Sequence, residues 1–131
     1  MFKTILVPTD GSEYAGRAED VAISLASKYD ARIVGVYVID EKLIYPYDVL
    51  EDEGKSILKN LSAKAKKEGV IVDEILVFGD PGKDLITITK RMNADIIVIG
   101  THGKKGLERI LLGSVAESIL KSVDVPVMLV K

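Results

Sequence analysis

One stretch near the end of the chain limits most strongly what the sequence can fold into. Four consecutive apolar residues, Ile96 to Ile99, predict a strand that is buried on both faces. Glycines follow at Gly100, Gly103 and Gly113, and Ser114 begins a segment with helical spacing of apolar residues. In such a strand–loop–helix unit the glycines let backbone N–H groups approach a ligand, and the first helical turn leaves its N–H groups without intrahelical partners. The stretch therefore predicts an α/β fold with an anion site suited to the phosphates of a nucleotide.

The same glycines also have a simpler interpretation. Gly100 and Gly103 could shape an ordinary tight turn, and Gly113 with Ser114 as N-cap could begin a helix without any ligand. Three cations in or near the loop favour the anion site, because a polyanion would gain charge-assisted hydrogen bonds from them: Lys104, Lys105 and Arg109.

Segments of strand type and helix type alternate along the whole chain. Short apolar runs predict strands at residues 3–9, 31–39, 70–78, 95–99 and 125–130. Helical spacing predicts helices from Ser12 to about Lys28, from about Val49 to Glu68, after the turn at residues 79–82, and from Ser114 to about Ser122. Strict alternation with mostly apolar strands implies an α/β fold with a five-stranded parallel sheet and helices on both faces.

A sheet of this class binds its ligand beyond the carboxyl ends of the strands, at the point where the strand order reverses. If the order is 3-2-1-4-5, this crevice lies between the first and the fourth strand. The first strand leads into Pro8, Thr9 and Asp10, and the fourth leads into Gly100 and Thr101. We therefore expect these two segments to meet, with Asp10 either contacting a ligand or capping the first helix through local backbone N–H groups.

Length and composition exclude several classes of protein. The 131 residues suit a single domain over residues 1–131, and the net charge of −2 gives no reason to expect nucleic acid or an anionic membrane as a partner. The absence of cysteine excludes disulfides and thiolate sites. No apolar run approaches the roughly 18 residues of a membrane span, and the chain opens on a strand. We expect a cytoplasmic protein.

Familiar catalytic patterns are missing from the sequence. Neither the Walker A spacing nor a G-x-G-x-x-G after the first strand is present, and no G-x-S-x-G elbow supports a serine hydrolase. The single histidine, His102, is expected to be a loop residue and not a general base, and without cysteine it cannot build an ordinary zinc site. We predict no catalytic residue and no metal held by protein side chains.

Several motifs together resemble the universal stress protein family over the whole chain. They are the sequences ILVPTDGS at the first strand, VYVID at the end of the second, Gly79-Asp80-Pro81 before the third helix and VPVMLVK at the end. The most specific is Gly100-x2-Gly103-x9-Gly113-Ser114, which resembles the motif of the ATP-binding branch. The resemblance implies a Rossmann-like fold of the adenine nucleotide alpha hydrolase-like type.

The resemblance also implies roles for individual residues. Asp10 and Val38 would hold the adenine and ribose, beside a wall that Pro8 and Thr9 shape. ATP would be the ligand, with Mg²⁺ carried on its phosphates. Gly106 adds a glycine to the motif and predicts a more mobile loop. The remaining positions implied in nucleotide binding are Gly100 under the ribose, Thr101 in the same loop, and Gly103, Gly113, Ser114 and Val115 at the phosphates.

The function predicted in this way is that of an ATP-binding universal stress protein, a nucleotide-dependent stress-response regulator with at most slow ATP hydrolysis. The alternative is an interaction or chaperone-like module of the same fold that binds AMP or no nucleotide. A metabolic synthetase is disfavoured, because neither H-x-G-H nor S-G-G-x-D-S occurs. The last strand, from Val125 to Val130, is apolar and would be a sheet edge, so it predicts pairing with another copy. The resemblance to the family implies that this homodimer is antiparallel.

Overall fold

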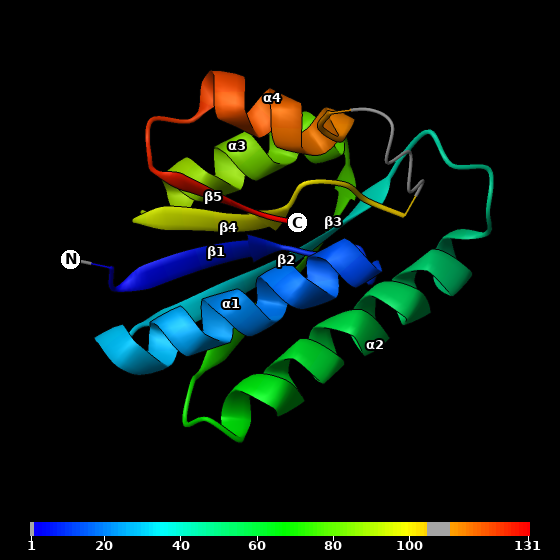
Figure 1. Ribbon diagram of the computed structural model, residues 1–131. Helices are drawn as coiled ribbons and strands as arrows, with labels where there is room; N and C mark the ends of the chain where they lie inside the picture. The colour runs from blue at the N-terminus through cyan, green and yellow to red at the C-terminus, as the bar shows by residue number, and fades with distance from the viewer. Residues whose placement is uncertain (1, 105–110) are drawn as a thin grey trace.

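The computed structural model describes residues 2–104 and 111–131. Within them strands and helices alternate as the sequence predicts (Figure 1). The strands are β1 (Thr4–Pro8), β2 (Arg32–Asp40), β3 (Val72–Gly79), β4 (Ile96–Gly100) and β5 (Val127–Val130). The helices are α1 (Glu13–Tyr29), α2 (Tyr47–Lys66), α3 (Pro81–Arg91) and α4 (Ser114–Ser122).

The described strands form one parallel sheet in the order β3-β2-β1-β4-β5. This confirms the predicted order and the Rossmann-like α/β fold. Helices α1 and α2 cover one face, and α3 and α4 cover the other (Figure 1). The chain runs from β1 outward to β2 and β3, then returns to the other side of β1 with β4. The order therefore reverses between β1 and β4, where a crevice at the carboxyl edge is expected.

Alternate side chains of the central strands supply the core on the two faces. Toward α1 and α2, the cluster contains Ile5, Val7, Ile96 and Val98, all at most 4% exposed. Toward α3 and α4, the corresponding cluster contains Leu6, Ile97, Ile99 and Ile119. The central strands are apolar on both sides because helices cover both faces of the sheet.

Some element boundaries differ from the sequence predictions for local reasons. Helix α2 begins at Tyr47, earlier than predicted, because Pro46 takes the N-cap position and needs no N–H there. It ends at Lys66, and Gly69 adopts the left-handed conformation (φ 72°) after its last turn. Strand β5 begins only at Val127, because Pro126 has no N–H to donate to the sheet. In the described part of the chain, no helix is both long and apolar enough to cross a bilayer.

Candidate functional site

Two segments that are far apart in the sequence meet at the carboxyl edge of β1 and β4. The Oδ2 atom of Asp10 accepts a hydrogen bond of 2.9 Å from the backbone N–H of Lys104. Its Oδ1 atom accepts one of 2.9 Å from the N–H of Ser12, which is the N-cap of α1. The contact with Ser12 confirms the local role that the sequence left open for Asp10, and its contact with a ligand stays a prediction. The carboxylate supports the start of α1 and at the same time holds the glycine loop beside β1.

The glycines of the loop meet different neighbours. A Cβ atom on Gly103 would lie 2.7 Å from the Oδ2 atom of Asp10, so only glycine lets these two residues approach so closely. A Cβ atom on Gly113 would lie 3.3 Å from the carbonyl oxygen of Thr101, and the N–H of Gly113 donates to that oxygen at 2.7 Å. Gly113 thus brings the start of α4 against the backbone that follows β4.

Gly100 is required for another reason. A Cβ atom there would lie 2.9 Å from both the carbonyl carbon and the Cβ atom of Tyr14 in α1. The backbone of α1 therefore packs directly on the end of β4. The sequence assigned Gly100 only to a ligand or to a tight turn and did not foresee this helix contact.

The start of α4 corrects one prediction. Ser114 was expected to be the N-cap, but Gly113 takes that position (φ −67°, ψ 157°) and α4 has no side-chain cap hydrogen bond. Ser114 is the first helical residue and is exposed, and Val115 after it is half-buried. The first-turn N–H groups of Ser114 and Val115 have no partner within the helix, and the helix dipole adds partial positive charge there. This end of α4 suits an anion.

The remaining predicted residues lie along β1 and β2 at the same edge. Pro8 is buried, and the N–H of Thr9 donates to the carbonyl oxygen of Val36 on β2 at 2.9 Å. Val38 lies two residues further along β2 and is half-buried in the cluster toward α3 and α4. The Thr9 hydroxyl points away from this edge and donates to Glu19 of α1 at 2.6 Å. Thr9 can therefore line the crevice with its backbone but not with its hydroxyl.

A cation stands beside Asp10. The Lys104 ammonium forms an ion pair with Glu53 of α2, and both side chains are about half exposed. Burial acts to lower the pKa of Lys104, but the hydrogen bond to Glu53 and the charges of Tyr37, Glu53 and Asp10 outweigh it and raise the pKa. Lys104 therefore keeps its charge at neutral pH. The other loop positions discussed from the sequence, Lys105, Gly106 and Arg109, lie outside the described residues.

Thr101 and His102 complete the loop. Thr101 is 8% exposed, and its Oγ1 atom lies 3.0 Å from the Nδ1 atom of His102. The imidazole ring is tilted against Tyr14, with ring centroids 5.0 Å apart. Away from the loop, Tyr45 is 68% exposed and Tyr47 packs edge-on against Phe78. Within residues 2–104 and 111–131, no group of three or more acidic or histidine side chains could hold a metal ion.

Two acidic residues near the site were missed in the sequence analysis. Glu53 could not be found from the sequence, because its link to Lys104 depends on how α2 lies in space. Glu19 did leave a signal. It occupies the same helical face as Ala15, Ala18 and Ala22, and a charged residue among buried alanines indicates a buried polar contact.

Comparison with known proteins identifies the group to which this fold belongs. The model of the universal stress protein family matches residues 1–131. The chain belongs to this family. The universal stress protein MJ0531 of Methanocaldococcus jannaschii is 36% identical and is matched over 100% of this chain and 83% of its own length.

Solved structures agree with the family and the fold. The structure of the hypothetical protein MJ0577 superposes with a TM-score of 0.88 at 34% identity, covering 100% of this chain and 96% of that one. A universal stress protein in complex with cAMP superposes with a TM-score of 0.79 at 28% identity, covering 98% and 97%. At least one relative of this chain therefore binds an adenine nucleotide.

Proposed function

We propose that this universal stress protein binds ATP in the crevice between β1 and β4 and acts as a nucleotide-dependent regulator in the stress response. The observation that carries the proposal is the 2.9 Å hydrogen bond between Asp10 and the Lys104 N–H, because it joins the end of β1 to the glycine loop. Family membership and the relative that binds cAMP support an adenine nucleotide as the ligand.

In this proposal the triphosphate lies on the loop and on the start of α4. Glycine at 103 and 113 keeps side chains away from the loop backbone and the start of α4, so that a bulky anion can approach the first-turn N–H groups of Ser114 and Val115. Ser114 is free of a capping role and can donate its hydroxyl. Asp10 accepts from the ribose or adenine, beside Val38 and the backbone of Pro8 and Thr9. The other proposed contacts are Gly100, Thr101 and Val115.

The proposal favours a triphosphate over a monophosphate because of Lys104. Its charged side chain forms an ion pair with Glu53, which is half exposed and therefore costs little to exchange for another anion. In the proposal the terminal phosphates of ATP take the place of Glu53 beside this cation, and AMP has no such phosphates. Mg²⁺ would be held by the phosphates and water, since phosphate oxygens are ligands that it prefers.

Fast hydrolysis is not part of the proposal. Efficient phosphoryl transfer needs a residue that orients the attacking water and a cation fixed on the terminal phosphate. His102 is half-buried between Thr101 and Tyr14, and Lys104 has a competing acidic partner in Glu53. We therefore propose binding with at most slow turnover, so that the state of the bound nucleotide carries the signal.

The relative that binds cAMP favours a second candidate, in which the ligand has one phosphate. AMP would use the same ribose contacts and the start of α4 but would not reach Lys104. The protein would then act as an interaction module whose shape does not depend on a triphosphate.

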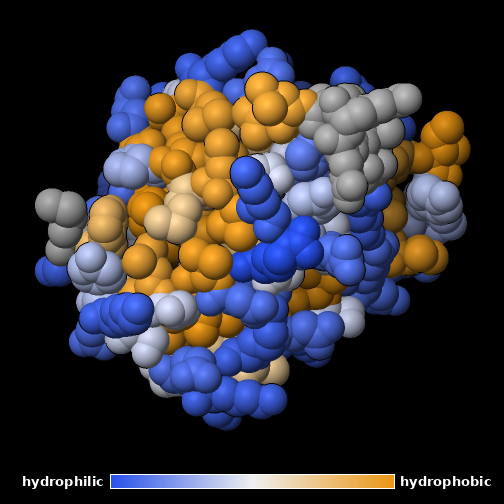
Figure 2. Space-filling model, viewed as in Figure 1, coloured by the Kyte–Doolittle hydropathy of each residue, from blue (hydrophilic) through white to orange (hydrophobic). Residues whose placement is uncertain are grey.

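We also propose that two copies pair through β5. This strand is one edge of the described sheet, so its outer backbone groups have no neighbouring strand there. Figure 2 shows apolar side chains gathered over α4 and β5 on this face; Leu120 is 43% exposed and Met128 is 36% exposed. Antiparallel pairing would satisfy the edge and cover these side chains. Sedimentation at micromolar concentration should give a dimer, and a monomer would contradict this part of the proposal.

The nucleotide proposal is tested on the purified protein. Denaturation of the purified protein should release bound ATP, which mass spectrometry identifies. Added ATP with Mg²⁺ should raise the melting temperature more than AMP or GTP does, because a ligand that binds only the folded state stabilises it. Release of AMP with an equal response to AMP and ATP would favour the second candidate. An empty site with no thermal response to any nucleotide would contradict both nucleotide ligands and favour an interaction module that binds no nucleotide.

A further inference from the structure

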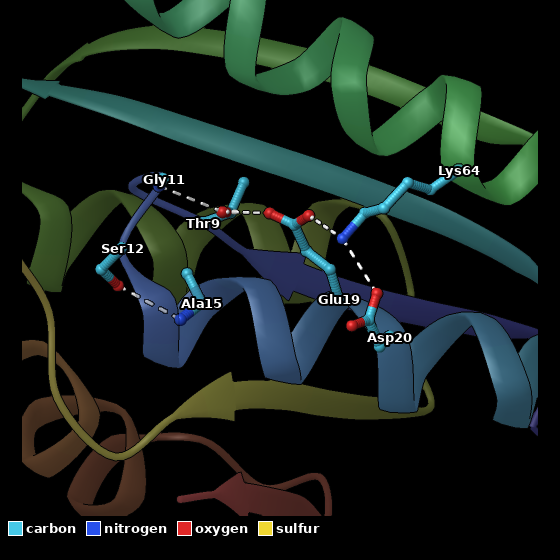
Figure 3. Close-up of polar contacts among 7 residues, drawn as sticks. All are labelled: Thr9, Gly11, Ser12, Ala15, Glu19, Asp20 and Lys64. Atoms are coloured by element: carbon cyan, nitrogen blue, oxygen red, sulfur yellow. Dashed lines mark hydrogen bonds and ion pairs between the residues drawn. The ribbon is translucent and has the colours of Figure 1, made fainter.

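A carboxylate lies inside the molecule directly behind the Asp10 turn. Glu19 of α1 is 5% exposed, and both of its oxygens have partners (Figure 3). Oε2 accepts the hydroxyl proton of Thr9 at 2.6 Å, and Oε1 pairs with the Lys64 ammonium of α2 at 2.8 Å. Lys64 also pairs with the exposed Asp20 at 2.9 Å. Burying such a charge is costly, and apolar residues of similar size often stabilise a protein better at such positions.

The Thr9 hydroxyl links Glu19 to the backbone of Gly11. A hydroxyl has one proton to donate, and here the buried carboxylate accepts it. The oxygen lone pairs are then turned toward the N–H of Gly11, which lies 3.4 Å from Oγ1. The residue enclosed between Thr9 and Gly11 is Asp10. Through the Thr9 hydroxyl, the buried carboxylate is thus linked to the turn that carries Asp10.

Asp10 connects this turn to the glycine loop that follows β4. With the turn fixed, its carboxylate accepts from the N–H of Ser12 on one side and from the N–H of Lys104 on the other. Glu19 in the interior is therefore hydrogen-bonded to the turn at residues 9–11, and Asp10 in this turn is hydrogen-bonded to the loop that follows β4.

We propose that Glu19 is a positioning residue of the nucleotide site and orients Asp10 through the hydroxyl of Thr9. This rests on the proposed function, in which Asp10 holds the ribose or adenine. The competing explanation is that Glu19 only ties α1 to α2 through Lys64. The two explanations predict different behaviour of Asp10 once the Glu19–Thr9 hydrogen bond is removed without loss of stability.

The deciding variant replaces both partners by apolar residues of similar size, Thr9→Val with Glu19→Leu. No buried carboxylate is then left without a partner, and Lys64 keeps Asp20, so the protein should remain folded. Thr9→Val alone removes the hydroxyl with little change in shape. The matched control is Asp20→Asn, which removes the outer ion pair of Lys64 but leaves the Glu19–Thr9 hydrogen bond intact.

Hydrogen exchange in the nucleotide-free protein is measured first, at the N–H groups of Ser12 and Lys104 that bind Asp10. Both variants that lack the hydroxyl should increase exchange at these two N–H groups about tenfold, relative to N–H groups in the middle of α1. The Asp20→Asn control should leave exchange there unchanged. Native exchange rates at Ser12 and Lys104 in the folded double variant would overturn the proposal.

ATP affinity is the second measurement. The double variant should bind ATP about tenfold more weakly than the wild type, without a lower melting temperature, and Asp20→Asn should bind it normally. If the double variant binds ATP as tightly as the wild type, Glu19 does not position the site and the proposal is wrong. If the wild type binds no ATP, the proposed function fails, and the exchange rates at Ser12 and Lys104 decide the positioning role by themselves.

Discussion

Gly100 and Gly113 belong to one sequence motif, yet the structure requires them for different reasons. At Gly100 a side chain would collide with the backbone of Tyr14, so this glycine lets α1 pack on the end of β4. At Gly113 a Cβ atom would meet Thr101 at 3.3 Å, a tight but less severe contact at the open edge of the site. Among the described residues, neither glycine has a positive φ, so both are needed for space and not for backbone conformation. The motif thus combines a glycine that the fold requires with one for which we propose a ligand role.

The largest expected effect comes from the ligand side of this comparison. Gly113→Val places a branched side chain over the start of α4, where two or more phosphate hydrogen bonds are proposed. Losing about 3 kcal/mol of charge-assisted hydrogen bonding corresponds to at least about a 100-fold weaker ATP affinity. The circular dichroism spectrum should remain that of the folded protein. Calorimetric titration measures the affinity, and unchanged ATP binding would remove the reason for assigning Gly113 to the site.

The fold side of the comparison predicts a loss of stability. Gly100→Ala forces α1 away from β4 and should destabilise the protein by about 1–3 kcal/mol, which lowers the melting temperature by roughly 3–12 °C. Gly16→Ala is the matched control, because a Cβ atom on Gly16 of α1 would meet nothing within 4 Å. The control should stabilise the helix by about 0.5–1 kcal/mol. Equal melting temperatures for the two variants would contradict the packing role of Gly100.

A smaller effect should separate ATP from AMP. Lys104→Ala should weaken ATP binding about fivefold, from the loss of about 1 kcal/mol, and leave AMP binding unchanged. Glu53→Gln releases Lys104 from its ion pair and should tighten ATP binding about twofold. Parallel titrations with ATP and AMP provide the test. If both nucleotides respond alike to Lys104→Ala, the cation does not contact the terminal phosphates.

The smallest effect is expected at Ser114. Because Ser114 is not the N-cap, Ser114→Ala should change the unfolding free energy by less than about 0.5 kcal/mol. Loss of one proposed hydrogen bond to phosphate, worth about 1 kcal/mol, should weaken ATP binding roughly fivefold or less. Chemical denaturation and titration separate these two quantities. A clear loss of stability would mean that the serine does cap the helix.

The fold could be predicted from the sequence because its pattern is local. Apolar runs such as Ile96 to Ile99 alternate with helical spacing, and this alternation restricts the sheet to few arrangements, one of which the structure confirms. The meeting of Asp10 with the loop after β4 followed from the same topology. The predicted bounds of α4, Ser114 to about Ser122, are confirmed, but its N-cap is Gly113 and not Ser114, because glycine and serine are both common N-caps and only the backbone angles distinguish them.

The rest of the site could not be predicted, because it depends on contacts between helices that the sequence pattern does not place. The Glu53–Lys104 ion pair requires α2 to lie beside the glycine loop, and the Glu19–Lys64 pair requires α1 and α2 to be neighbours. The collision of a Gly100 side chain with Tyr14 likewise depends on how closely α1 approaches β4. Spacing along the chain identifies candidate ligand groups, but the partners that hold them come from packing.

The central claim is that backbone N–H groups at the start of α4, together with Asp10, form the binding site for ATP. It is tested most directly by titrating ¹⁵N-labelled, nucleotide-free protein with ATP and Mg²⁺ and following the amide signals. The account predicts saturable shifts concentrated at Gly103, Gly113, Ser114 and Val115 and at the turn around Asp10. Shifts that are absent at millimolar ATP, or that gather on another face of the molecule, would contradict it.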